Sequence, residues 1–89
     1  PELRAFWAGI AEPLIDDMAA GIEAARASGQ ALPAPPDAHD LARALTDMYW
    51  RAGRHASLDP PTPDAEQRLI DTLTVITLRA IYGADRVAG

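Results

Sequence analysis

The side chains of this sequence that are best suited to chemistry are two histidines, a serine and a pair of adjacent acids. His39 and His55 are sixteen residues apart and fit no zinc-ligand spacing such as H-E-x-x-H. His55 and Ser57 stand close together, but no third residue completes a nucleophilic triad with them. Asp16 and Asp17 point about 100° apart on a helix, which favours a solvated acidic face over a catalytic pair. We therefore expect no catalytic residue, no metal and no cofactor, and we do not expect an enzyme.

Aromatic and hydroxyl side chains are more informative. Trp7 falls on an apolar helical stripe, where it belongs either to the core or to the lining of a cavity. Thr46 and Tyr49 place two hydroxyls one helical turn apart. These either hold the polar group of a ligand in an apolar pocket or hydrogen-bond within the protein. Trp50 lies about 180° from Leu41 on the same helix, and an exposed tryptophan favours a partner surface.

Three stretches with apolar residues at intervals of three and four must position these side chains. In the first stretch the apolar stripe comprises Leu3, Phe6, Trp7, Ile10, Leu14, Met18, Ile22 and Ala25. Proline-rich segments at 30–36 and 58–63 separate the stretches, and Asp37 has the position of an N-terminal cap. Pro13 predicts a kink rather than a break, because the apolar spacing stays in phase across it. We predict an all-α fold of three antiparallel helices at about 2–28, 37–57 and 64–82.

The last of these helices is apolar on more than one face. One face suits the core of this chain and comprises Leu69, Leu73, Ile76 and Ala80. Leu78 lies about 180° from Leu69, so the two leucines cannot face the same core. In so short a chain, we expect the second face to contact something other than this chain. Under the family resemblance given below, Asp71, Thr74 and Leu78, together with Trp50, would form a dimer interface.

Composition narrows the possible functions. The chain has 89 residues, no cysteine and a net charge of −5, and its positive charges are all arginines. An acidic chain of this kind is unsuited to gripping nucleic acid by itself, because phosphate neutralisation needs a clustered basic face. No stretch approaches the length of an apolar membrane span, and no secretory signal is visible, so we expect no membrane contact and a cytoplasmic location. We expect the 89 residues to be a fragment of a longer protein.

Two motifs resemble a known family. The run HDLARALTDMYWR at 39–51, a short proline-containing loop and the run LIDTLTVITLRAIYG at 69–83 resemble the end of TetR-family transcriptional repressors, in particular those of the ethionamide type. The first helix resembles these proteins more loosely, through Trp7 and the residues before Gly29. The resemblance covers nearly the whole chain.

The resemblance implies a regulator in which a C-terminal helical domain binds a small hydrophobic effector. Operator DNA would be bound only by an N-terminal helix-turn-helix domain, which is absent from residues 1–89. The last two helices would pair with those of a second subunit in a four-helix bundle, giving a homodimer. Carried over position by position, the implied ligand-binding residues are Trp7, Leu14, Met18, Thr46, Tyr49 and Thr77. Of these, only Trp7 keeps the residue type of the family pattern.

A second hypothesis needs no ligand. The same helices would suit a protein–protein interaction or dimerisation module, whose apolar faces serve only to bind another chain. Thermal unfolding in the presence of apolar small molecules separates the two hypotheses, because a ligand that binds the folded state raises the midpoint.

Overall fold

The structure is a computed structural model that describes residues 2–83, apart from the side chains at positions 2, 3, 7 and 8. It contains three α-helices: α1 (Glu2–Ala27), α2 (Ala38–Leu58) and α3 (Pro63–Tyr82). The all-α prediction is confirmed, and each predicted helix end lies within one residue of the observed one. Pro13 lies inside α1, which continues through it as one helix.

Local hydrogen bonds define the ends of the helices. The carboxylate of Asp37 accepts hydrogen bonds from the backbone N–H groups of His39 and Asp40 at 3.0 and 3.2 Å, so Asp37 caps α2 as predicted. Thr62 caps α3 through its hydroxyl, and Pro63 occupies the first helical turn, where its missing N–H costs nothing. Gly83 ends α3 in the left-handed conformation, with φ of 86°, which favours glycine.

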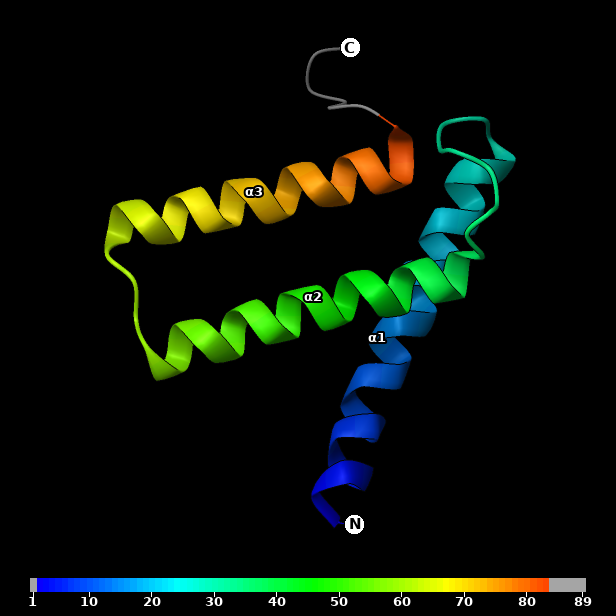
Figure 1. Ribbon diagram of the computed structural model, residues 1–89. Helices are drawn as coiled ribbons and strands as arrows, with labels where there is room; N and C mark the ends of the chain where they lie inside the picture. Colours follow the sequence, from blue (N-terminus) through cyan, green and yellow to red (C-terminus); the bar gives the residue numbers. More distant parts are fainter. Residues whose placement is uncertain (1, 84–89) are drawn as a thin grey trace.

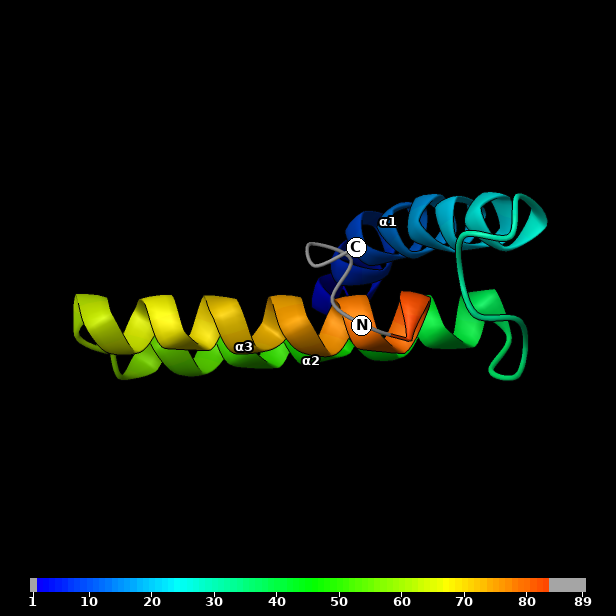
Figure 2. The same cartoon turned by 90° about the horizontal axis from the view of Figure 1, so that it is seen from above.

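The three helices form two layers. Figure 1 shows α2 and α3 lying side by side and running in opposite directions, with α1 crossing α2 obliquely near its beginning. Seen from above, α1 lies on one side of the layer that α2 and α3 make (Figure 2). Among the described residues no helix covers the opposite side of that layer, which we call the uncovered face.

The hydrophobic core lies where α1 crosses α2. Its buried members are Ile15, Ala19 and Ile22 from α1 and Ala38, Leu41, Ala42 and Leu45 from α2. The predicted stripe of α1 is therefore only partly correct: Phe6, Ile10 and Leu14 are exposed by 61%, 38% and 52%. The oblique crossing brings a neighbouring face of the helix, centred on Ile15 and Ala19, against α2.

Helix α3 packs loosely within this chain. None of its residues is buried, although Ala80 and Ile81 pack against the α1–α2 core. Ile76, predicted to face the core, is 44% exposed. Ile70 is 47% exposed as well, whereas the other large apolar residues of α3 are half-buried. The connector after α1 holds the end of α3 in place, because the backbone N–H of Leu32 donates to the carbonyl of Ile81 at 2.8 Å.

Within residues 2–83, none of the helices is both long enough and apolar enough to cross a membrane.

Candidate functional site

An apolar surface runs along the first half of α1. Phe6, Ile10 and Leu14 are largely exposed there, while Met18, farther along the helix, is half-buried against the core. Leu14 and Met18 are two of the predicted ligand-binding residues. The side chain of Trp7, a third, lies outside the described residues.

Thr46 is the buried polar residue of α2. The residue is 7% exposed, and its hydroxyl oxygen, Oγ1, has no hydrogen-bond partner among the described residues. A buried hydroxyl without a partner costs about 1–3 kcal/mol of desolvation, and native proteins seldom leave such a group unpaired.

Tyr49 and Thr77 join α2 to α3 through their hydroxyls. Tyr49 Oη lies 2.8 Å from Thr77 Oγ1 and 3.3 Å from the carbonyl oxygen of Leu73, and Thr77 Oγ1 lies 2.8 Å from the same carbonyl. The two hydroxyl protons are shared among three contacts, two to the carbonyl and one between the hydroxyls. Both protons are used within the protein in every arrangement of these contacts, so the pair offers an incoming molecule only acceptor lone pairs.

These observations bring part of the predicted site together. Tyr49 and Thr77 are in direct contact. Thr46 lies one helical turn before Tyr49 on α2 and is not part of that network. The hydroxyl of Thr46 is therefore buried and unpaired among the described residues, and Tyr49 keeps acceptor lone pairs beside Thr77.

Two polar side-chain contacts between α1 and α2 were not predicted from the sequence. The guanidinium of Arg43 donates to both carboxylate oxygens of Glu12 at 2.9 and 3.2 Å, and His39 Nε2 lies 3.1 Å from Asp16 Oδ1. The hydrogen bond to Glu12, followed by the charge of that carboxylate, raises the pKa of Arg43. Glu12 and Arg43 are 31 residues apart, so no local spacing links them.

These two contacts also bring together three side chains of types that can bind a metal ion. Ligand atoms of Glu12, Asp16 and His39 lie within 4.8 Å of one another. Arg43 already pairs with Glu12, and the side chains in both contacts are about half-exposed to solvent. The arrangement therefore acts as two surface contacts that align α1 on α2, the Arg43–Glu12 ion pair and the His39–Asp16 hydrogen bond, each with a small effect on stability.

The predicted dimer residues occupy different parts of the surface. Trp50 follows Arg43 by seven residues, or two helical turns, so the two lie on one stripe of α2, about 180° from the buried Leu41. It is 41% exposed. Asp71 lines an open groove on α3, whereas Thr74 and Leu78 do not, and Leu78 is half-buried.

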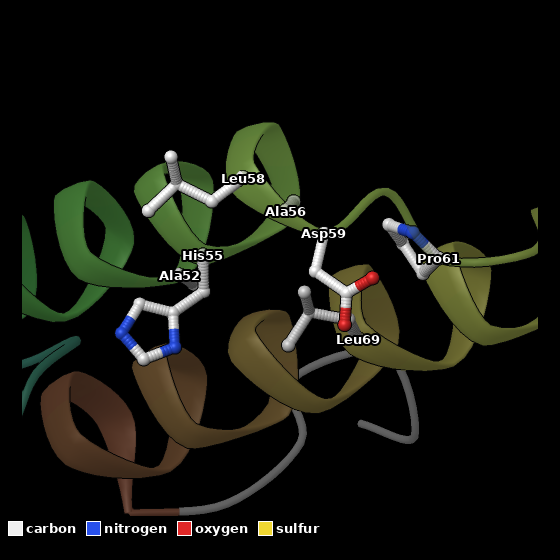
Figure 3. Close-up of a pocket in the computed structure, with 7 residues that line it drawn as sticks. All are labelled: Ala52, His55, Ala56, Leu58, Asp59, Pro61 and Leu69. Atoms are coloured by element: carbon white, nitrogen blue, oxygen red, sulfur yellow. The ribbon is translucent and has the colours of Figure 1, made fainter.

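Two hollows mark the surface of the α2–α3 layer. One, of about 480 Å³, lies where α2 ends and α3 begins and is lined by Ala52, His55, Ala56, Leu58, Asp59, Pro61 and Leu69. Figure 3 shows the ring of His55 pointing from α2 toward α3, with Asp59 and Leu69 across the hollow from it. The other is the α3 groove, of about 330 Å³, lined by Asp71, Thr72, Val75, Ile76 and Arg79. None of the predicted ligand-binding residues lines either hollow.

Comparison with known proteins identifies the class. Residues 1–83 match a model of the C-terminal domains of transcriptional regulators, so the chain is a regulatory domain and not an enzyme. The model is described as "Transcriptional regulator EthR, C-terminal domain", and the chain belongs to this family. This confirms the TetR-family resemblance of its motifs.

One curated relative shows how much of the chain is similar to a known regulator. The HTH-type transcriptional regulator EthR of Mycolicibacterium smegmatis is 39% identical over 83 residues, which is 93% of this chain and 38% of the relative. The chain therefore spans about 38% of that regulator's length. No solved structure gives a significant match.

Proposed function

We propose that this chain is the effector-binding and dimerisation domain of a TetR-like transcriptional repressor. A small apolar molecule binds the domain and changes the affinity of the regulator for operator DNA. The operator is held by an N-terminal helix-turn-helix domain outside residues 1–89, and the regulator works in the cytoplasm, where that DNA lies. The family and the curated HTH-type relative support this assignment.

The observation that carries the ligand proposal is the buried, unpartnered hydroxyl of Thr46. The exposed apolar surface of α1 at Phe6, Ile10 and Leu14 adds a lining suited to an apolar molecule. The effector site that we propose comprises Trp7, Leu14, Met18, Thr46, Tyr49 and Thr77, completed by helices from the preceding part of the regulator.

The hydrogen-bond donors and acceptors of the proposed site indicate which polar groups the effector carries. The Tyr49–Thr77 pair offers acceptors only, so the effector group that meets it must be a donor. Thr46 offers a donor, which suits a carbonyl or ether oxygen. An apolar molecule that carries an N–H or O–H group near an acceptor oxygen, such as a secondary amide, fits both requirements.

The dimer proposal rests on the exposed apolar residues of α3. No residue of α3 is buried, and Ile70 and Ile76 are 47% and 44% exposed. Burial of such side chains contributes roughly 25 cal/mol for each Å² of apolar surface removed from water. A second copy that covers α3, and the uncovered face beside it, provides this burial in a four-helix bundle of two α2–α3 pairs.

The test uses the full-length regulator and a panel of apolar amides matched to apolar hydrocarbons of the same size. We expect an amide to raise the unfolding midpoint and to release a fluorescent operator duplex selected from random DNA. Thr46→Val should remove the preference for amides over the matched hydrocarbons. A panel that neither raises the midpoint nor changes DNA binding would contradict the effector proposal.

A ligand-free dimerisation module is the second candidate, and the loose packing of α3 favours it as much as it favours the effector domain. The two differ in the same experiment. A module without a ligand forms the dimer, yet its midpoint stays the same with every compound of the panel.

A further inference from the structure

We propose that Glu12, Asp16 and His39 form a binding site for a divalent transition-metal ion, Zn²⁺ or one of similar size, where α1 crosses α2. One ligand atom from each side chain lies within 4.8 Å of the other two. The site is separate from the effector site and the dimer contact proposed above and depends on neither. It differs from the expectation drawn from the sequence, because His39 is 23 residues from Asp16 and no ligand spacing along the chain links them.

The packing of α1 against α2 brings the three side chains together. Glu12 and Asp16 are four residues apart, so they lie one turn apart on the same face of α1. His39 stands in the first turn of α2, where its backbone N–H donates to the capping carboxylate of Asp37 at 3.0 Å. Ile15, which neighbours Asp16 in the chain, is 1% exposed in the core between the two helices. A packed junction of two helices therefore positions the ligands, which favours a preformed site.

The distance between His39 and Asp16 suits a shared ion. Zinc binds imidazole nitrogen and carboxylate oxygen at about 2.0–2.2 Å, so two of its ligands lie about 3.0–3.4 Å from each other. His39 Nε2 lies 3.1 Å from Asp16 Oδ1. An ion can therefore replace this hydrogen bond while both side chains keep their places. Both are partly exposed, which leaves room for water to complete the coordination.

Arg43 leaves Glu12 able to bind a cation. One guanidinium nitrogen, Nη2, donates to both carboxylate oxygens at 2.9 and 3.2 Å. A carboxylate has about four lone-pair sites, so Glu12 keeps lone pairs for an ion while Arg43 orients it. Asp40 and Asp47 also act on Arg43 through their charges. Acids thus outnumber the guanidinium around the site, and their charge favours a bound cation.

The donor set indicates the kind of ion. An imidazole nitrogen together with carboxylate oxygens suits Zn²⁺ and its first-row neighbours, whereas Mg²⁺ and Ca²⁺ prefer oxygen ligands alone. An acidic surface that merely attracts cations would have no need of His39. The contribution of His39 therefore distinguishes a metal site from an acidic patch.

A bound ion would join α1 to α2 across their crossing. Because the ligands come from both helices, the folded domain binds the ion better than the unfolded chain does, and binding raises the unfolding midpoint. Zinc would thus strengthen the junction that carries the core of the domain.

The experiment uses the full-length regulator without a histidine tag, stripped of metal by a chelator and titrated with Zn²⁺ in a calorimeter. His39→Gln removes the imidazole but keeps an N–H group that can donate to Asp16, and Asp16→Asn removes the carboxylate at similar size. We expect each change to raise the zinc dissociation constant about tenfold or more. Each should also abolish most of the rise in unfolding midpoint that zinc causes in the wild type.

Two matched controls change the same residue types elsewhere. Asp17→Asn alters the acid next to Asp16, which points about 100° away on α1. His55→Gln alters the exposed histidine at the far end of α2. Both should keep the zinc dissociation constant within about threefold of the wild type. Excess Mg²⁺ should not displace the zinc, and circular dichroism without metal should show every variant as helical as the wild type.

The outcomes are distinguishable. Weaker zinc binding in His39→Gln and Asp16→Asn, with both controls unchanged, supports the site. A wild-type regulator that binds no zinc overturns it, and so do site variants that bind zinc as tightly as the wild type. Equal losses in the controls, or displacement of zinc by Mg²⁺, would mean an acidic surface only and also overturn it. The effector and dimer proposals are untouched by each of these results.

Discussion

Removing the hydroxyl of Tyr49 tests the junction between α2 and α3 most directly. Tyr49→Phe keeps the ring and deletes a group that lies 2.8 Å from Thr77 Oγ1 and 3.3 Å from the Leu73 carbonyl. Thr77 still donates to Leu73 at 2.8 Å, so the change leaves no buried group unpaired. A net hydrogen bond is worth about 0.5–1.5 kcal/mol. Because Tyr49 is 39% exposed, we expect the lower part of that range, about 0.5–1 kcal/mol of unfolding free energy.

A double-mutant cycle isolates the pair. Tyr49→Phe, Thr77→Val and the double variant are unfolded in urea at one fixed protein concentration, because dimerisation makes stability depend on concentration. The two hydroxyls are in direct contact, so their coupling free energy should be about 0.5 kcal/mol or more. Tyr49→Phe should also weaken binding of amide effectors, since the acceptor lone pairs leave with the hydroxyl.

Two results would refute this reasoning. A coupling free energy of zero would mean that the hydroxyls do not interact in solution. A Tyr49→Phe variant more stable than the wild type would mean that the hydroxyl is a cost to the fold rather than a link between its helices.

Four further changes probe the rest of the domain. Ile15 is 1% exposed in the core, so Ile15→Ala should lower the unfolding free energy in urea by about 2–5 kcal/mol; a loss below about 1 kcal/mol would deny its central place. Thr46→Val removes an unpaired buried hydroxyl and should raise the unfolding free energy by about 1 kcal/mol while weakening effector binding in calorimetry. Leu78→Glu, at a half-buried position outside the α3 groove, should lower the unfolding midpoint; if sedimentation shows dissociation with no such loss, Leu78 belongs to the interface. Arg43→Met should lower the midpoint slightly and equally at pH 6 and pH 9. The raised pKa of Arg43 means that its contribution is present below the ordinary arginine pKa and is lost only above it, and a pH-dependent loss in this window would contradict the assignment.

The ends of the helices could be predicted from the sequence because they depend on groups within a few residues. A cap such as Asp37 bonds N–H groups two and three positions along, and Gly83 supplies a left-handed residue that closes the preceding turn. The TetR-family resemblance was equally accessible, since it lies in the order of residues along α2 and α3. These features predicted the fold class and the kind of protein.

The choice among helix faces belonged to the tertiary structure. The stripe through Ile10 and Leu14 and the stripe through Ile15 and Ala19 both satisfy the three-and-four spacing, and the oblique crossing of α1 over α2 buries the second. The same crossing brings Arg43 to Glu12, 31 residues away, which no spacing within one helix encodes.

The sequence by itself therefore determined the helices, their caps and the family, because hydrogen bonds and side-chain periodicity within each segment decide them. Only the tertiary structure decided that Thr46 is buried without a partner, that Tyr49 and Thr77 bond each other, and that Asp71 and Arg79 end a common groove. The physical reason is that burial and charge pairing depend on the angle and distance at which two helices meet. Those quantities arise from the packing of the whole domain and are not encoded in any one helix.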